Sequence, residues 1–213
     1  MRYFLCLISC WLATQACLAG LRTPESLTDA LAFIYNGSPD AARDFVEAGA
    51  DVNAVGDAGM TLLMAVAYSG DVKTLDWLLK QGARINAQTA TGDTAVALAA
   101  YQGHLAEVQR LCEQGAELNL PGWTPLIYAA FNGHADIVDY LLTQKVAIDA
   151  REPNGASALM LAARNGHMDI VKMLLKHKPN LSLSNVNGFT AYSWAINKGN
   201  TDIADLLKAA EKQ

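Results

Sequence analysis

The sequence has few of the features that metal-binding, disulfide-bonded or nucleic-acid-binding proteins need. Only four cysteines occur in 213 residues, and three of them lie among the first nineteen. The 21 acidic residues outnumber the 16 basic ones, which form no cluster, so nucleic-acid binding is disfavoured. Because a glycine-rich phosphate loop, a nucleophile elbow and a paired-carboxylate motif are all absent, we predict no catalytic residue, no metal site and no cofactor.

Long hydrophobic runs are also absent. The longest candidate is the apolar stretch Phe4–Ala13, which is shorter than the roughly 20 residues that cross a bilayer. With Arg2 before it and the small residues Ala16 and Ala19 after it, residues 1–19 have the pattern of a secretory signal peptide. We expect cleavage after Ala19 and a soluble, exported domain of residues 20–213, most simply in a bacterial periplasm.

A lipid anchor at Cys17 is the alternative to this processing. Cleavage after Ala16 would expose Cys17, but Thr14 and Gln15 fit poorly where a lipoprotein signal has an aliphatic and then a small residue. Cleavage after Ala19 leaves Cys112 as the only thiol, so no intramolecular disulfide could form. The remaining 15 basic and 21 acidic residues would give a net charge of −6.

Two series of glycines recur through the rest of the chain. The first is Gly37, Gly70, Gly103, Gly133, Gly166 and Gly199, with spacings of 33, 33, 30, 33 and 33 residues. The second is Gly59, Gly92, Gly122, Gly155 and Gly188, and two residues after each comes a hydroxyl: Thr61, Thr94, Thr124, Ser157 and Thr190. This regularity indicates a structural repeat.

Each unit predicts two short helices. The hydroxyl can cap the free amides of a first helix, and Pro125 follows Thr124 at the first helical position. A glycine of the first series can end that helix in the left-handed conformation. A second helix follows at once, as in "HADIVDYLL" (residues 134–142), whose apolar residues have helical spacing. Helices this short need stacked neighbours.

These units resemble the ankyrin repeat family. The matching stretches are "GWTPLIYAAFNGHADIVDYLL" (122–142), "GASALMLAARNGHMDIVKMLL" (155–175), "GADVNA" (49–54) and "GARINA" (82–87). The resemblance implies an all-α repeat solenoid of helix–turn–helix units with β-turn fingers, about five repeats plus an N-terminal capping helix pair. The expected units are about 26–57, 58–90, 91–120, 121–153, 154–186 and 187–213.

The sequence departs from the family pattern at several places. Met64, Ala97, Ile127, Met160 and Ser193 replace the family's histidine, so packing is expected to substitute for its hydrogen bonds at most of these sites. Lys145 and Lys178 stand where other units have Gly82 and Gly115, which predicts irregular helix ends. Only two residues separate Asn119 from Gly122, so one finger is shortened.

The ends of the domain are predicted to act as caps. Thr23 and Pro24 offer an N-cap and a first helical residue, and residues 26–37 a degenerate first helix. The last helix has polar residues for a solvated face, namely Asp202, Asp205, Lys208, Glu211 and Lys212.

Three histidines occupy one repeat position. His104, His134 and His167 could be taken for metal ligands, but neighbouring helices lie about 8–10 Å apart, whereas zinc holds imidazole nitrogens at about 2 Å. We therefore expect each to bond nearby backbone, His177 to be solvated, and Cys112 to be a small buried apolar residue.

An aromatic stripe is the candidate binding surface. Tyr35, Tyr68, Tyr101 and Phe131 occupy one position, two residues before a helix-ending glycine, which by resemblance is the exposed concave end of the first helix. Arg164 and Asn197 follow at the same position, and Met60, Trp123 and Phe189 would lie beside the groove, with Trp123 exposed by the shortened finger. The alternative is that these rings only pack on the next helix. Core packing is expected for Trp77, Tyr128 and Trp194.

The resulting hypothesis is a non-enzymatic scaffold in the periplasm that binds another protein through its concave groove, as a monomer or in a heteromeric complex. It would act as an inhibitor or immunity protein of an envelope-directed toxic enzyme, or as an oxidative-stress helper of a catalase-type enzyme. The alternative is a secreted effector that binds host proteins. The partner-binding residues expected are Tyr35, Tyr68, Tyr101, Phe131, Arg164, Met60, Trp123 and Phe189.

Overall fold

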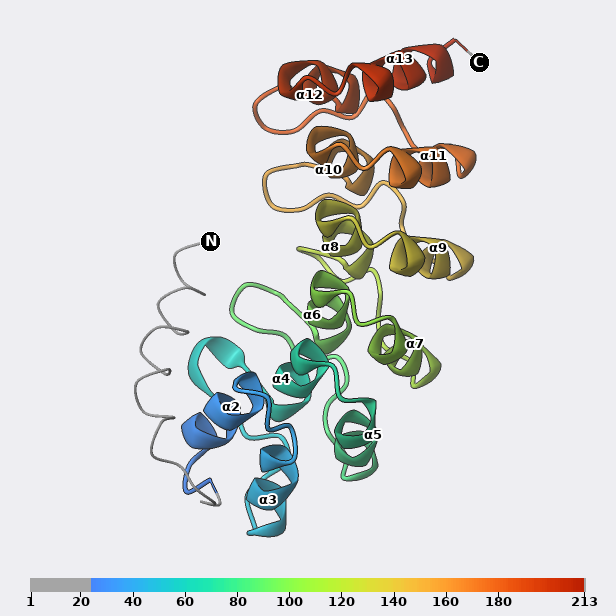
Figure 1. The fold of residues 1–213 in the computed structure, drawn as a ribbon. Coiled ribbons are helices and arrows are strands. Elements are labelled where there is room, and N and C mark those ends of the chain that lie inside the picture. Colours follow the sequence, from blue (N-terminus) through green and yellow to red (C-terminus); the bar gives the residue numbers. More distant parts are fainter. Residues whose placement is uncertain (1–23, 213) are drawn as a thin grey trace.

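The computed structural model describes residues 24–212, within which twelve α-helices form six helix–turn–helix pairs. Figure 1 shows the pairs stacked into a curved array, with loops projecting on one side. The first helices of the pairs are α2 (Leu27–Tyr35), α4 (Leu62–Ser69), α6 (Ala95–Gln102), α8 (Pro125–Asn132), α10 (Ala158–Asn165) and α12 (Ala191–Lys198). The second helices are α3 (Ala41–Glu47), α5 (Val72–Lys80), α7 (Leu105–Glu113), α9 (Ala135–Thr143), α11 (Met168–Lys176) and α13 (Thr201–Ala210). The all-α repeat solenoid is confirmed.

The repeated hydroxyls and glycines set the bounds of the first helices, as the sequence predicted. In α4, the Thr61 hydroxyl accepts a hydrogen bond from the Met64 amide, and Gly70 ends the helix at φ 85°. Thr94, Thr124, Ser157 and Thr190 cap the next four first helices in the same way, and each of those helices ends at a left-handed glycine. Because the cap satisfies an amide that the helix cannot, it fixes where each helix begins.

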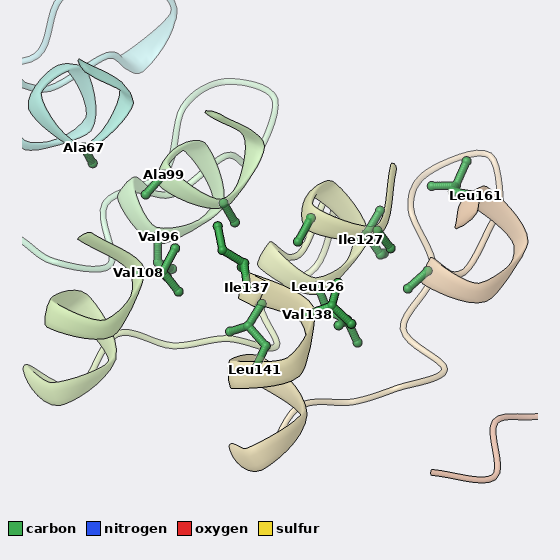
Figure 2. Close-up of a cluster of buried hydrophobic side chains, with 14 of the residues drawn as sticks. Ala67, Val96, Ala99, Val108, Leu126, Ile127, Ile137, Val138, Leu141 and Leu161 are labelled. Atoms are coloured by element: carbon green, nitrogen blue, oxygen red, sulfur yellow. The ribbon is translucent and has the colours of Figure 1, made fainter. Parts of the chain in front are cut away.

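The core lies between the two layers of helices. Residues 62–67, 125–130 and 158–163 of the first helices are buried without a break, because neighbours cover these helices on several sides. The second helices bury one face only, as Ile137, Val138 and Leu141 do in α9. Figure 2 shows such side chains from successive pairs filling the space between the helices.

Packing replaces the family's histidine in four of five units. Met64, Ala97, Ile127 and Met160 are each at most 1 % exposed. Ser193 differs, because its hydroxyl accepts a hydrogen bond from the Thr190 amide at 2.8 Å and completes a capping box. A polar role therefore persists in the last unit, the one of these five sites where packing does not replace the histidine.

The loops between pairs are joined by polar side chains. The side-chain oxygen of Asn53 accepts from the Arg84 amide at 2.8 Å, and that of Asn86 accepts from the Glu117 amide at 2.9 Å. Asn119 and Asp149 make the same contact with the loop that follows each of them. Each loop is thereby held in register with the next.

The fingers are shaped by one recurring backbone hydrogen bond. It runs from Gly56 to Met60, Thr89 to Asp93, Glu152 to Ala156 and Asn185 to Phe189, at 2.8–3.0 Å. Adjacent fingers are linked by Ala90 donating to Ala58 at 2.7 Å and by Val186 donating to Asn154 at 2.9 Å. Among the backbone bonds of residues 24–212, none joins the shortened loop, residues 120–123, to either neighbouring finger.

Both ends of the domain partly follow the prediction. Helix α2 begins at Leu27 with Ser26 as its N-cap, not at Pro24, because the Ser26 hydroxyl accepts from the Asp29 amide. Thr23, like the expected leader of residues 1–19 and Cys17, lies outside the described residues. The predicted polar residues of α13 and the residues after it are all exposed, which confirms a solvated outer face.

Lys145 and Lys178, which stand where other units have a glycine, follow helices that end differently. Lys178 takes the left-handed conformation, at φ 54°, that glycine adopts in other units. After α9 the chain instead turns extended at Gln144, so of these two helix ends only that of α9 is irregular.

No helix within residues 24–212 is long and apolar enough to span a bilayer.

Candidate functional site

A row of aromatic rings runs along the first helices. The Tyr35 ring meets the Tyr68 ring edge-on at 5.5 Å between centroids, and the Tyr68 and Tyr101 rings stack at 6.4 Å. Each side chain comes from the end of a first helix, so the register of the repeat brings together residues 33 positions apart. The predicted stripe is therefore formed in its first three members.

The row then passes through two side chains of the unit with the shortened finger. The Tyr101 ring lies edge-on to the Tyr128 ring, with 5.3 Å between the ring centroids. Tyr128 stacks on Trp123 at a centroid distance of 4.8 Å, and Trp123 meets Phe131 edge-on at 5.6 Å. We call these six residues the aromatic row: Tyr35, Tyr68, Tyr101, Tyr128, Trp123 and Phe131. Trp123 is half-buried, not exposed as expected, because two rings cover it.

Tyr128 anchors this part of the row. Its hydroxyl donates to the Asp93 carboxylate at 2.7 Å, and Asp93 also accepts from the Thr91 hydroxyl at 2.6 Å. Burial and the bond to Asp93 raise the pKa of Tyr128 well above its ordinary value. Because Asp93 belongs to the preceding finger, this contact links two units where the finger-to-finger backbone bond is missing. Core packing of Tyr128 is confirmed, at 7 % exposure.

The other rings of the row are half-buried. Burial, and then the neighbouring Tyr68, raise the pKa of Tyr35 to about 12. Burial and Tyr101 raise the pKa of Tyr68 as well. These rings pack on one another and still present a face to solvent, so they combine the two alternatives that the sequence left open.

We call the surface of the first helices that carries the aromatic row the inner face. A depression continues this face beyond the row. It has a volume of about 430 Å³ and is lined by Trp123, Glu152, Asn154, Leu161, Arg164, Asn185, Asn187, Phe189, Trp194, Asn197 and Lys198. We call it the C-terminal depression. It includes finger residues as well as Arg164 and Asn197, which share the repeat position of Tyr68. That repeat position therefore faces the space between helices and fingers.

Three of the predicted residues are brought together here, and one is not. Trp123, Arg164 and Phe189 line the C-terminal depression. The Arg164 guanidinium lies over the Trp194 ring at 5.2 Å, and Phe189 stacks on Trp194 at 6.1 Å. Met60 is half-buried against the core and belongs to neither the aromatic row nor the C-terminal depression.

Sequence analysis missed Trp194, Leu161 and Lys198 as lining residues. Trp194 packs against the core, as expected, but is only half-buried and also lines the depression. Tyr128, Leu161 and Trp194 share one repeat position, four residues after the capping hydroxyl. The recurrence of a large side chain at that repeat position is the sequence signal that could have identified Leu161 and Trp194 as lining residues. Trp77, on α5, is also only half-buried and lies under the Arg43 guanidinium at 5.7 Å.

The histidines are structural, as predicted. The Nε2–H groups of His104, His134 and His167 donate to the carbonyls of Tyr68, Tyr101 and Phe131 in the preceding unit, at 3.0–3.1 Å. Each ring thereby holds the helix end that carries a ring of the aromatic row. Within residues 24–212, no three His, Cys, Asp or Glu side chains are grouped to hold a metal ion.

Cys112 is half-buried, not fully buried as expected. Burial raises the pKa of its thiol, and the hydrogen bond with Tyr140 only partly offsets this. Since the thiolate is the reactive form, this environment disfavours reaction at Cys112.

Comparison with known proteins identifies the repeat. A family model described as ankyrin repeats (3 copies) matches residues 28–121, 63–152 and 142–213. Comparison with curated proteins finds no match. Ankyrin repeats are general, non-enzymatic modules of protein–protein interaction. The matches together extend over residues 28–213, and the chain belongs to the ankyrin repeat family.

Proposed function

We propose that the protein is a periplasmic, non-enzymatic scaffold that binds another protein along its inner face. The observation that carries this proposal is the unbroken aromatic row, which reaches from Tyr35 to Phe131 and continues into the C-terminal depression. Tyr and Trp side chains tend to dominate the binding energy of interfaces, so a row of half-exposed rings is well suited to this use.

Several features support the aromatic row as a preformed surface. The helix ends that carry Tyr68, Tyr101 and Phe131 are held by the histidine rings of the following units. Tyr128 is fixed by its bond to Asp93. Side chains that are already ordered lose less conformational entropy when a partner binds.

Two periplasmic roles fit such a scaffold. One is an inhibitor or immunity protein that blocks an envelope-directed toxic enzyme, and the other is an oxidative-stress helper of a catalase-type enzyme. The alternative is a secreted effector that binds host proteins. Cell fractionation separates the two periplasmic roles from the effector. Recovery in the periplasm supports the first two roles, whereas recovery in the medium supports the effector.

Affinity capture tests the proposed surface. The mature chain is used as bait in an envelope extract, and the captured protein is compared with that held by Tyr68→Ala/Tyr101→Ala. Because a single hot-spot side chain contributes about 2 kcal/mol or more, the double variant should lose capture almost completely. The matched control is Phe45→Ala/Tyr140→Ala, which removes half-buried rings from the outer helices α3 and α9.

The thermal transitions of all variants are measured alongside. Loss of capture with a folded inner-face variant, and retention by the outer-face control, support the proposal. Equal capture by the inner-face variant and the wild type contradicts it.

A further inference from the structure

We infer that the C-terminal depression binds an acidic, apolar segment of the partner protein, with a carboxylate at Arg164 and Lys198 and an apolar side chain against Trp123, Phe189 and Trp194. This inference rests on the proposed function and adds the chemistry of the partner and its direction along the inner face.

Two cations, Arg164 and Lys198, line the C-terminal depression. Within residues 24–212, neither Arg164 nor Lys198 forms an ion pair; the basic groups that do are those of Arg43, Arg110 and Lys172. The Cζ atom of Arg164 lies over the Trp194 ring, 5.2 Å from the ring centroid. A guanidinium held over a ring by a cation–π contact can also bind a planar carboxylate with two parallel hydrogen bonds.

One acidic residue, Glu152, also lines the depression. The Glu152 carboxylate is committed to its own finger, because one oxygen accepts from the backbone amide and side chain of Asn154. The other oxygen accepts from the Ala156 amide at 3.0 Å, and the residue is only 4 % exposed. Arg164 and Lys198 therefore leave the depression with an excess of positive charge.

The lining of the depression also has an apolar part. Phe189 stacks on Trp194 at 6.1 Å, and Trp123 connects the depression to the aromatic row. With Leu161 as a buried neighbour, these rings can cover an apolar side chain beside a bound carboxylate. A site with apolar surface next to a cation favours a segment that has an apolar side chain beside its acidic residue, and not an acidic residue alone.

Charge is distributed unevenly along the domain. Residues 24–121 contain 13 acidic and 5 basic residues, whereas residues 122–212 contain 8 acidic and 9 basic residues. An acidic segment is therefore repelled by the N-terminal half of the solenoid, whose net charge is −8, and not by the C-terminal half, whose net charge is +1. This asymmetry gives the partner one direction, with its acidic end in the C-terminal depression and a less charged part along the tyrosines.

The experiment uses the full mature chain and two synthetic peptides. One alternates Asp or Glu with Phe and Leu, and the other has Asn and Gln in place of every acid. Calorimetric titration should show that the acidic peptide binds at least about tenfold more tightly, because charge-assisted hydrogen bonds are lost in the amide peptide. The preference should weaken as salt is added.

The variants locate the binding. Arg164→Gln/Lys198→Gln should remove the preference for the acidic peptide. The control Lys176→Gln/Lys208→Gln removes the same net charge from exposed positions on α11 and α13 and should keep that preference. No binding of the acidic peptide, equal binding of both peptides, or an unchanged preference in Arg164→Gln/Lys198→Gln would overturn the inference.

The captured partner separates this inference from the proposed function. If Tyr68→Ala/Tyr101→Ala loses the partner and Arg164→Gln/Lys198→Gln retains it fully, the inner face binds protein but the acidic-segment inference is wrong. If both variants retain the partner, the proposed function itself fails.

Discussion

At the scale of single residues, Gly133 shows why a glycine and a histidine recur together. Gly133 ends α8 at φ 86°, a conformation that costs other residues roughly 1 kcal/mol. A Cβ at Gly133 would also lie 2.7 Å from Cε1 of His167, whose ring bonds the Phe131 carbonyl. The helix-ending role could be predicted from sequence. The second reason could not, because the ring that fills the space belongs to the next unit.

The tyrosines give a prediction at this scale. Burial raises the pKa of Tyr35 to about 12, so the folded protein binds the phenolic proton more tightly than the unfolded chain does. Its contribution to stability is fully present below the ordinary pKa of about 10 and is lost as the pH rises towards 12. Denaturant unfolding at a series of pH values should show stability falling through this window.

The matched control for that measurement is Tyr35→Phe, which cannot ionise. The variant should show a shallower fall across the same window, with part of the remaining slope coming from Tyr68, Tyr128 and Tyr140, whose pKa values are also raised. Identical slopes for the two proteins would mean that Tyr35 is not buried in the folded state.

At the scale of elements, the helices follow from local signals and the aromatic row does not. Thr61 and Gly70 bound α4 through contacts within a few residues, so sequence predicts such a helix. The position of Trp123 depends on Tyr128 and Phe131, whose rings pack against it in the unit with the shortened finger. The sequence predicted an exposed Trp123, because the shortened finger can be recognised from the glycine spacing. The packing of Tyr128 and Phe131 against Trp123 cannot be recognised in that way.

The bond between Tyr128 and Asp93 gives a prediction for this element. Tyr128→Phe keeps the ring stack but removes the hydroxyl that donates to the buried carboxylate at 2.7 Å. Leaving Asp93 short of a donor should destabilise the protein by about 1–3 kcal/mol in denaturant unfolding. Tyr192→Phe is the control, since the Tyr192 hydroxyl makes no hydrogen bond within the part of the chain that the structure describes, and its stability should match the wild type. A neutral Tyr128→Phe variant would mean that the bond does not hold the two units together.

At the scale of the whole molecule, stacking of units creates a surface that no single unit has. Each second helix buries one face against the first helices, and the loops are joined by side-chain oxygens of Asn53, Asn86, Asn119 and Asp149. Sequence predicts this stacking because the period is regular. The C-terminal depression, by contrast, is formed by five segments of three units, and only three of its lining residues were predicted.

Side-chain footprinting of the complex with the captured protein tests the central claim most directly. Free and bound forms are labelled with hydroxyl radicals and compared by mass spectrometry. Binding along the inner face predicts lower reactivity of Tyr68, Tyr101 and Trp194 in the complex, with Trp77 and Tyr140 of the outer helices unchanged. Protection of Trp77 and Tyr140, with Tyr68, Tyr101 and Trp194 still reactive, would contradict it.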